Sequence, residues 1–334
     1  MTDFAPILEA VRQSASLCRV VQQTQIVSGA KVGAEPVTIA DYGTQAILCR
    51  AISRAFPDDA VIAEEQSAQF TRLFSSEQRA HVAGLVSVAL GETVSEADLV
   101  RWLDHGQDRK AARTWIIDPI DGTSSFQKLK RYTIAIGFTV DGRAVEGILG
   151  APGHPSGDDL GALFYTADEG RSAYAEPLGG GQARQIRISD TFDLGALTLV
   201  QSPGASRGEQ DTAGQVRRAA GISVLSYIEW PDSQNKYLTL ATGDADLLMY
   251  VAYGPSMNFK VWDHAAGVAL VEAAGGVVTD LDGSPIDFGQ GNTLSGNAGI
   301  IAANPYIHGQ VLQAVQSVQG ITPNTSIPAK PHYI

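Results

Sequence analysis

The sequence of 334 residues contains only two cysteines, Cys18 and Cys49, and they do not form a C-x-x-C pair. So few cysteines without paired spacing exclude a disulfide-stabilised fold and a cysteine-rich zinc site. We therefore predict that both residues are reduced, buried thiols. This is expected of a protein of the cytoplasm, where thiols are kept reduced.

The chain also lacks long hydrophobic runs and a basic N-terminal segment. No stretch approaches the roughly 20 apolar residues that a membrane-spanning helix needs. The N-terminal sequence MTDF has no basic region followed by an apolar core, so no secretory signal is predicted. With 44% hydrophobic and 18% charged residues, the composition is typical of a soluble globular protein with a sizeable core.

Positively charged residues are in deficit, since 24 Lys and Arg against 36 Asp and Glu give a formal net charge of −12. A surface of this sign repels polymeric nucleic acid and anionic membranes, so both are excluded as partners. A small anionic substrate is compatible with this charge, because bound metal ions can reverse the sign inside one pocket.

Hydrophobic periodicity predicts a chain that alternates between helices and strands. Apolar residues recur at helical spacing over residues 4–27, and a second helix is predicted to end near Phe56. A short buried strand follows at residues 60–63, and the polar stretch after it has a mostly helical pattern. Apolar runs on both sides of Asp141-Gly142 predict a β-hairpin. After about residue 190 strands and helices alternate, which favours sheets covered by helices, an α/β (layered α+β) fold.

Residues 115–124, with the sequence WIIDPIDGTS, bring two carboxylates, a proline, a glycine and a hydroxyl into one short segment. Three apolar residues before Asp118 predict a buried strand, and Pro119 is expected to end it because proline cannot donate a ladder hydrogen bond. Asp118 and Asp121 would then face one pocket, with the Ile120 carbonyl between them. Two carboxylates this close repel each other unless a cation lies between them, and oxygen ligands suit hard ions such as Mg²⁺.

The two residues that follow also suit a ligand site. Gly122 would allow a ligand to approach the backbone closely, and Thr123 would offer a hydroxyl next to the metal. The alternative interpretation is an ordinary turn with solvated aspartates, since the pattern D-x-x-D-G is common in loops. The segment alone does not decide between these interpretations.

Three other acidic sites could complete such a pocket. Glu64-Glu65 follow the predicted strand, which places a carboxylate at a sheet edge. Asp263 opens a helix predicted at residues 263–274, where an N-cap or a favourable interaction with the helix dipole is the structural alternative. Asp41 lies at the start of the second predicted helix, where it could serve as a cap. Each of these residues taken alone is better explained by a structural role.

Taken together, these motifs resemble those of the inositol monophosphatase superfamily, the lithium-sensitive, magnesium-dependent phosphatases. The resemblance rests on a strand ending in Glu-Glu, the run DPIDGT, and the run WDHAAG followed by EAAGG. Within the superfamily the chain looks most similar to the 3'(2'),5'-bisphosphate nucleotidases. Four details favour this branch: PVTIADY at residues 36–42, the long polar insert between Glu65 and Asp118, DSQNKY at residues 232–237, and IDFGQG at residues 286–291.

The resemblance extends from the first helix to about Asn304, and it implies alternating layers in the order helix-sheet-helix-sheet-helix. Residues 1–190 would form an N-terminal α+β subdomain with the Glu-Glu and DPIDGT loops. Residues 191–320 would form a C-terminal α/β subdomain with the WDHAAG helix and the nucleotide contacts. Residues 321–334 would be a loosely held tail. The active site would lie between the two subdomains.

The resemblance also implies a role for each acidic site. The ligands of two or three Mg²⁺ ions would be Glu64, Asp118, the Ile120 carbonyl, Asp121 and Asp263. Asp41 and Thr123 would form a hydrogen-bonded pair that takes a proton from the attacking, metal-activated water. Phosphoryl transfer depends mainly on positioning and charge stabilisation, so such a site suffices without a covalent phosphoenzyme.

The implied substrate contacts are Asp121, Gly122, Thr123, Ser206, Arg207, Ser233, Lys236 and Asp263. Lys236 offers a point charge for phosphate, although an ordinary helix start with a solvated lysine is the structural alternative. The loop at residues 202–207 lacks the histidine usual in nucleotidases, and Arg207 could replace its contact. Tyr250 stands where an arginine is usual, and it can stack on a ring but cannot neutralise a phosphate. His264 is interpreted as structural, since Mg²⁺ prefers oxygen ligands.

The resemblance implies removal of the 3'-phosphate from adenosine 3',5'-bisphosphate, a by-product of sulfate activation, to give AMP and phosphate. The partner would be this small nucleotide, in a cytoplasmic protein with a slight preference for the monomer, and Li⁺ would inhibit by occupying a metal site. An inositol monophosphatase or sugar-phosphate phosphatase with the same metal site is the alternative, which the missing arginine keeps open. A catalytically idle metal-binding regulator is a further alternative, against which the complete acidic set argues.

Overall fold

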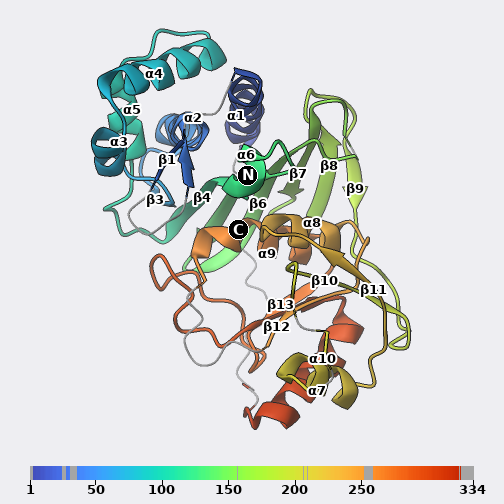
Figure 1. Ribbon diagram of the computed structural model, residues 1–334. Coiled ribbons are helices and arrows are strands. Elements are labelled where there is room, and N and C mark those ends of the chain that lie inside the picture. The colour runs from blue at the N-terminus through green and yellow to red at the C-terminus, as the bar shows by residue number, and fades with distance from the viewer. Residues whose placement is uncertain are drawn as a thin grey trace.

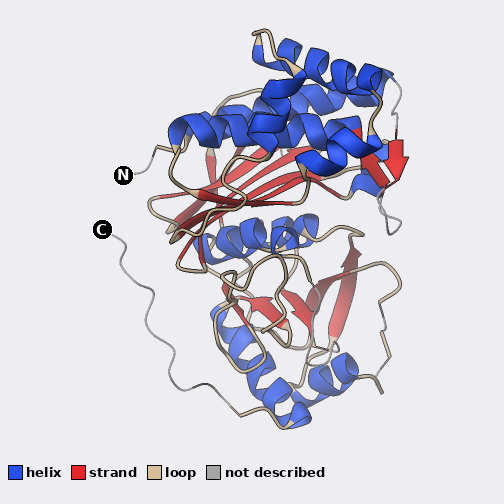
Figure 2. Cartoon of the chain, turned by 90° about the vertical axis from the view of Figure 1, so that its left-hand side faces the viewer, coloured by secondary structure: helices blue, strands red, loops and turns tan. Residues whose placement is uncertain are grey.

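The computed structural model describes residues 3–24, 28–30, 36–155, 157–205, 207–208, 210–251, 259–322 and 324. A helical layer covers a seven-stranded sheet, a pair of helices separates this sheet from a five-stranded sheet, and further helices cover the second sheet (Figure 1). In Figure 2 these five layers follow one another from top to bottom. The predicted order helix-sheet-helix-sheet-helix is confirmed.

Two long N-terminal helices form the centre of the first layer. α1 (Ala5–Thr24) packs along α2 (Ile39–Ala55), and both lie within the ranges predicted as helices. Between them in the sequence, β1 (Ser28–Ala30) and β2 (Pro36–Thr38) form a short antiparallel ribbon.

The polar insert adds three helices to this layer, which confirms its helical pattern. Ser75 and Ser95 each begin a helix with a capping box, in which the serine hydroxyl accepts a hydrogen bond from the third helical residue. The helices are α3 (Ser67–Leu73), α4 (Ser76–Leu90) and α5 (Glu96–Leu103).

The seven-stranded sheet has the order β3-β4-β5-β6-β7-β8-β9. β3 and β4 pair in parallel and the other neighbours are antiparallel. The predicted hairpin joins β5 and β6, and Asp141 and Gly142 at its turn have φ angles of 49° and 76°, as a type I′ turn requires. The strands are β3 (Ala60–Ala63), β4 (Arg113–Asp121), β5 (Thr133–Val140), β6 (Arg143–Pro152), β7 (Gly161–Ala167), β8 (Ser172–Pro177) and β9 (Arg184–Ile186).

Both faces of this sheet are covered, and the side chains of β4 alternate between two hydrophobic cores. Trp115 and Ile117 belong to the core beneath the first helical layer. Ile116 belongs to the core shared with the middle helices, α8 (Gln234–Ala241) and α9 (Ala265–Ala273). Burial on both faces explains why the strand has a continuous apolar run instead of an apolar-polar alternation.

The five-stranded sheet has the order β11-β10-β12-β14-β13. β10 pairs in parallel with β11 and β12, whereas β14 is antiparallel to β12 and β13. α7 and α10 pack against each other beyond this sheet. The elements are β10 (Leu197–Gln201), α7 (Thr212–Ala219), β11 (Val224–Glu229), β12 (Leu247–Tyr250), β13 (Val277–Thr279), β14 (Ile300–Ala303) and α10 (Pro305–Gln319).

Two glycines allow α9 to lie very close to the seven-stranded sheet. A Cβ atom added at Gly137 of β5 would come within 2.6 Å of the Ala265 Cβ, and one added at Gly147 of β6 within 2.2 Å of the Ala266 carbonyl oxygen. Only glycine permits such an approach between two backbones. The start of α9, which directly follows Asp263, is therefore fixed over the centre of the sheet.

Several predictions for the whole chain can be compared with the structure. Both cysteines are buried and free, as predicted, and burial raises the pKa of each thiol to about 12. Within the described ranges no helix is long and apolar enough to span a bilayer. Most of the predicted tail lies outside the described residues. The boundary predicted at residue 190 falls between β9 and β10 and stays a prediction.

Gly147→Ala should destabilise the protein by about 1–3 kcal/mol, because the added methyl group overlaps the Ala266 carbonyl. Urea denaturation followed by circular dichroism measures the change. Gly84→Ala in α4 is the matched control, because no atom lies within 4 Å of its added Cβ. This control should stabilise the protein by about 0.5–1 kcal/mol through helix propensity. Equal effects of the two substitutions would contradict the close approach of α9 to β6.

Candidate active site

The aspartate segment forms an irregular end of β4. Asp118 pairs with Ala135 and Asp121 with Thr133 on β5, so three steps along β4 correspond to two along β5. The extra residue is a β-bulge, which changes the direction of the side chains around it. The expectation that Pro119 ends the strand is wrong, because the strand continues to Asp121. A bulge tolerates proline, since one residue there is left out of the ladder.

Asp118, Asp121 and Asp263 lie together, and we call these three residues the aspartate cluster. One carboxylate oxygen from each lies within 4.8 Å of the others. The first two residues come from the bulge of β4, in which the Ile120 N–H donates to Asp118 Oδ1 at 3.1 Å. Asp263 ends a 3₁₀ turn, η1 (Val261–Asp263), which contacts β4 and precedes α9. The cluster thus joins the two halves of the chain.

Burial makes the charged form of Asp118 unfavourable. The residue is 3% exposed, and burial raises its pKa well above the ordinary value. The negative charges of Glu64, Asp121, Asp263 and Asp41 raise this pKa further, in that order. The other four acidic residues therefore lie close enough to Asp118 to disfavour its charged form.

The pKa of Asp121 is raised in the same way, but two neighbouring groups stabilise its charged form. Burial raises its pKa most, followed by the charges of Asp232 and Asp263. The Gln234 N–H, which donates to Asp121 Oδ2 at 2.6 Å, and the positive charge of Lys236 act in the opposite direction. Buried carboxylates in such surroundings bind protons or need a cation.

Glu64 and Asp41 are positioned by β3 and α2. The Glu64 N–H donates to the Ile117 carbonyl at 3.2 Å, which extends the pairing of β3 with β4 by one residue. The Gln45 side chain of α2 accepts a hydrogen bond from the Glu65 N–H at 2.8 Å and donates to the Glu65 carbonyl at 2.7 Å. Asp41 lies in the first turn of the same helix and is 1% exposed. α2 therefore fixes the backbone beside Glu64 and carries Asp41.

Gly122 and Thr123 connect the bulge to the short helix α6 (Thr123–Gln127). Gly122 has a φ angle of 92°, and a Cβ added there would lie 3.2 Å from the Asp232 Cβ. This backbone conformation favours glycine. Thr123 donates its hydroxyl to the Ile120 carbonyl at 3.1 Å. The hydroxyl therefore lies beside the carbonyl that was expected to be a metal ligand.

The segment before and within the first turn of α8 adds two residues to which the sequence analysis gave no role. Asp232 Oδ1 accepts a hydrogen bond from the Asn235 N–H at 2.9 Å, and Asp232 also faces Asp121. Gln234 donates its side-chain amide to the Trp262 carbonyl at 2.9 Å. A carboxylate before a helix looks like a cap in the sequence, and the contact of Gln234 with the cluster is made by its backbone. Neither contact has a sequence signal of its own.

Lys236 is buried, so the alternative of a solvated lysine at a helix start is wrong. Its side chain is 2% exposed, and burial lowers its pKa. The charges of Asp121, Asp232 and Asp263 act in the opposite direction. The protein thus holds a cation of its own beside the aspartate cluster. Ser233 occupies the N-cap position of the same helix.

Arg207 is held on β11. Its guanidinium donates to Glu229 at 2.6 Å and lies 4.5 Å from the centre of the Tyr227 ring. Tyr250 is buried, with its ring centre 5.8 Å from Lys236 Nζ. The structure thus brings Tyr250 beside Lys236, while Arg207 is engaged by Glu229. Ser206 lies outside the described residues.

His264 has a structural role, as the sequence analysis expected. Its Nδ1 forms a 2.7 Å hydrogen bond with the Tyr237 hydroxyl. Burial lowers the pKa of His264 to about 3, so the ring is neutral at physiological pH. The ring therefore packs against Tyr237, Tyr250 and Phe259 without adding charge to the site.

The donor set of the aspartate cluster suits a hard divalent cation. It consists of carboxylate oxygens, with Glu64 and the Ile120 carbonyl close by. Oxygen ligands of this kind are those that Mg²⁺ prefers. A divalent cation would also remove the repulsion that raises the pKa of Asp118. The residues present therefore fit a magnesium site.

Comparisons with known proteins cover nearly the whole chain. Residues 4–320 match the model of the inositol monophosphatase family. A 3'(2'),5'-bisphosphate nucleotidase of Oryza sativa is 31% identical over 94% of this chain and 93% of the relative. A protein of the same description from Schizosaccharomyces pombe is 30% identical over 95% of this chain and 96% of the relative. In structure, an IMPase of Thermotoga maritima matches with a TM-score of 0.61 and 22% identity, over 94% of this chain and 96% of that one.

Asp118→Asn should stabilise the metal-free protein at pH 8 by about 1–3 kcal/mol, because it removes one charge from a buried repulsive cluster. The gain should shrink as the pH falls towards 5. A carboxyl with a raised folded-state pKa costs stability above that pKa, and the cost disappears as the folded state takes up the proton. Urea denaturation of both proteins with a chelator at several pH values measures the difference. A gain that is independent of pH would contradict the repulsion.

Proposed function

Because the chain belongs to the inositol monophosphatase family, we propose that it is a Mg²⁺-dependent phosphomonoester hydrolase that acts at the aspartate cluster. Its proposed substrate is adenosine 3',5'-bisphosphate, from which it removes the 3'-phosphate to give AMP and phosphate. The observation that carries the proposal is that three carboxylates lie within 4.8 Å of one another in a chain that matches the family model over residues 4–320. The nucleotidases that are 31% and 30% identical to the chain support the choice of substrate.

The proposed metal site holds two or three Mg²⁺ ions. When bound, these ions lower the pKa of the attacking water and neutralise the leaving oxygen. Asp121 keeps its orientation through the 2.6 Å hydrogen bond from the Gln234 N–H. The proposed ligands are Glu64, Asp118, the Ile120 carbonyl, Asp121 and Asp263.

Asp41 and Thr123 are the proposed proton acceptors. The water oxygen attacks phosphorus, while the water proton passes to Thr123 Oγ1 and the Thr123 proton passes to the Asp41 carboxylate. The 3'-oxygen leaves with the electron pair of the broken P–O bond and takes a proton from solvent water, which gives the 3'-hydroxyl of AMP. Thr123 Oγ1 lies 3.1 Å from the Ile120 oxygen and donates its proton there in the resting state. The relay requires this proton to turn towards Asp41. The buried position of Asp41, which is 1% exposed, supports its role as the final base.

The substrate contacts belong to three segments. The phosphate is contacted by Asp121, Gly122, Thr123 and Asp263. Gly122 has no side chain, so its backbone is open to the phosphate. Lys236 is the charged contact from α8, and its burial beside three aspartates supports a preset position. The nucleotide contacts are completed by Ser233, Ser206 and Arg207.

The proposal extends to the setting of the reaction. The substrate is the by-product of sulfate activation, so the enzyme acts in sulfur metabolism in the cytoplasm, as a monomer. Two free, buried cysteines support a reducing compartment. Li⁺ inhibits by occupying one of the metal positions.

Phosphate release from adenosine 3',5'-bisphosphate, inositol 1-phosphate and fructose 1,6-bisphosphate, measured side by side, tests the substrate. The nucleotide should have the highest kcat/KM, a chelator should abolish turnover, and Li⁺ should inhibit it.

Asp121→Asn should lower kcat by about 10³-fold or more, because a carboxylate ligand is lost. Asp190→Asn, an exposed aspartate outside the site, is the control and should behave as wild type. Best turnover of the inositol ester would refute the nucleotidase assignment, and an active Asp121→Asn would refute the metal assignment.

A second pair of variants tests the proton relay. Thr123→Val removes the hydroxyl and should lower kcat by about 10²–10⁴-fold, the usual contribution of general base catalysis. Thr123→Ser keeps the hydroxyl and should retain most of the activity. Measured kcat and KM values separate the relay from substrate binding, since the relay acts on kcat. Similar activities of the two variants would exclude the hydroxyl from the reaction.

A further inference from the structure

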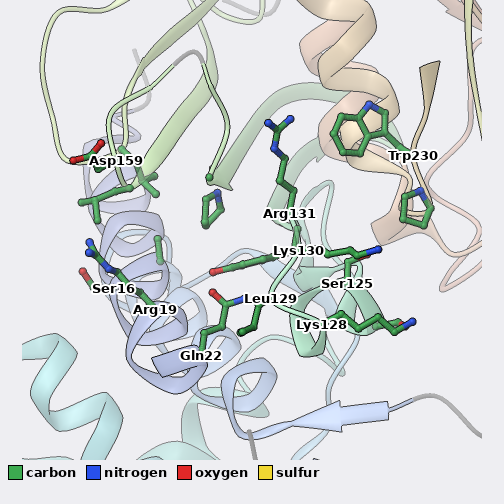
Figure 3. Close-up of a pocket in the computed structure, with 18 of the residues that line it drawn as sticks. Ser16, Arg19, Gln22, Ser125, Lys128, Leu129, Lys130, Arg131, Asp159 and Trp230 are labelled. Atoms are coloured by element: carbon green, nitrogen blue, oxygen red, sulfur yellow. The ribbon is translucent and has the colours of Figure 1, made fainter. Parts of the chain in front are cut away.

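A large pocket opens beside the aspartate cluster, and its lining has no part in the proposed reaction. It has a volume of about 1230 Å³ and is bounded by α1, by residues 124–132 after the aspartate loop, and by Trp230 and Pro231 (Figure 3). The next residue, Asp232, packs against Gly122 of the aspartate loop. Two segments of the lining therefore continue directly into residues beside the cluster, Ser124 into Thr123 and Pro231 into Asp232.

Basic side chains dominate this lining, and we call the site the basic pocket. Arg19 comes from α1, and Lys128, Lys130 and Arg131 follow α6. All four are exposed, and within the described part of the chain none of them forms an ion pair. Figure 3 shows Arg19 on one side of the pocket and Lys128 and Lys130 on the other, with Arg131 extending towards Trp230.

The acidic residues of the lining do not neutralise this charge. Glu229 accepts a hydrogen bond from Arg207 at 2.6 Å, and Glu9 lies 3.9 Å from Arg12. Asp159 is the remaining carboxylate of the lining. The pocket thus has an excess of positive charge in a chain whose net charge is −12. Such a local reversal of sign attracts anions.

The backbone and one aromatic ring hold the basic residues in place. Leu129 has a φ angle of 56°, which is unusual for a residue other than glycine, and the Lys130 N–H bonds back to a carbonyl of α6 at 2.9 Å. The Arg131 guanidinium lies 5.6 Å from the centre of the Trp230 ring. Trp230 in turn donates its indole N–H to Thr239 at 2.9 Å. A backbone outlier kept in an ordered loop is typical of a functional site.

The position of the basic pocket matches a second phosphate on the same substrate. α6 rises roughly 7 Å from Thr123 to Lys128, which is the scale of a ribose that carries two phosphates. Inside the site, Lys236 is surrounded by aspartates and Tyr250 has no charge to offer. The positive charge that Tyr250 cannot supply is available in the basic pocket.

We propose that the basic pocket binds the second phosphate of a nucleoside bisphosphate while the first phosphate lies at the aspartate cluster. This inference rests on the proposed function and deepens it. Charge-assisted hydrogen bonds from Lys128, Lys130 and Arg131 hold the second phosphate, and Arg19 closes the far side. The basic pocket, and not the metal site, then selects bisphosphates over monophosphate esters.

The test compares adenosine 3',5'-bisphosphate with adenosine 3'-monophosphate, which lacks the second phosphate. The double variant Lys128→Ala/Lys130→Ala should lower the ratio of their kcat/KM values (bisphosphate over monophosphate) about tenfold or more, through the KM of the bisphosphate. The double variant Lys128→Arg/Lys130→Arg should restore the ratio. Lys110→Ala/Arg72→Ala removes two exposed positive charges elsewhere and is the charge-matched control, which should leave the ratio unchanged.

Three outcomes would overturn the inference. A wild type that prefers the bisphosphate, together with an unchanged ratio in Lys128→Ala/Lys130→Ala, would refute the basic pocket and leave the proposed function intact. An equal fall in the control variant would assign the effect to net charge. A wild type that turns over neither nucleotide would refute the proposed function, and the basic pocket with it. Thermal unfolding of each variant verifies that the fold is intact.

Discussion

Repulsion between buried carboxylates is the constraint on which the site depends. Asp118 and Asp121 are buried and Asp263 is half-buried, so water screens their charges poorly, and burial and neighbouring charges raise the pKa values of the first two. Such a cluster lowers the stability of the folded chain. The stabilisation comes from the hydrophobic cores on either side, which force the bulge of β4 and the start of α9 to meet. The cluster is thus a junction of repelling charges, whose repulsion a divalent cation would remove.

The positive charges around the aspartate cluster form two groups, one buried and one exposed. Lys236 is buried and surrounded by aspartates, so its charge is committed to the protein. The charges of Lys128, Lys130 and Arg131 are exposed in the adjoining pocket and are available to a ligand. In the proposed reaction, bound metal ions, the buried Lys236 and the exposed basic residues would contact different parts of one anionic substrate. The net charge of −12 gives no indication of this arrangement.

Local structure was predictable from the residues themselves, whereas the convergence of Asp118, Asp121 and Asp263 was predictable only through the resemblance to a known family. β3 and the hairpin at Asp141-Gly142 were predictable because apolar runs and turn residues act over a few positions. Pro119 was misjudged because a bulge accommodates proline, which no local pattern reveals. The contact between the Gln234 N–H and Asp121 could not be predicted, since every residue but proline has this donor. The burial of Lys236 depends on packing between elements. The sequence SQNK at residues 233–236 alone also fits a helix start with a solvated lysine.

The absence of side chains at Gly137 and Gly147 has a consequence for the geometry of the aspartate cluster. The backbone of α9 is seated directly on two bare strands, and an interlocked contact of this kind has few alternative positions. Asp263 lies in the 3₁₀ turn that leads directly into that helix, and Asp118 lies on the sheet, so the separation of the two backbones that carry these carboxylates depends on this contact. A side chain larger than hydrogen at either glycine would push α9 away from the sheet and carry Asp263 away from Asp118. The geometry of the acidic site is then a property of backbone contact between a helix and a sheet, remote from the carboxylates themselves.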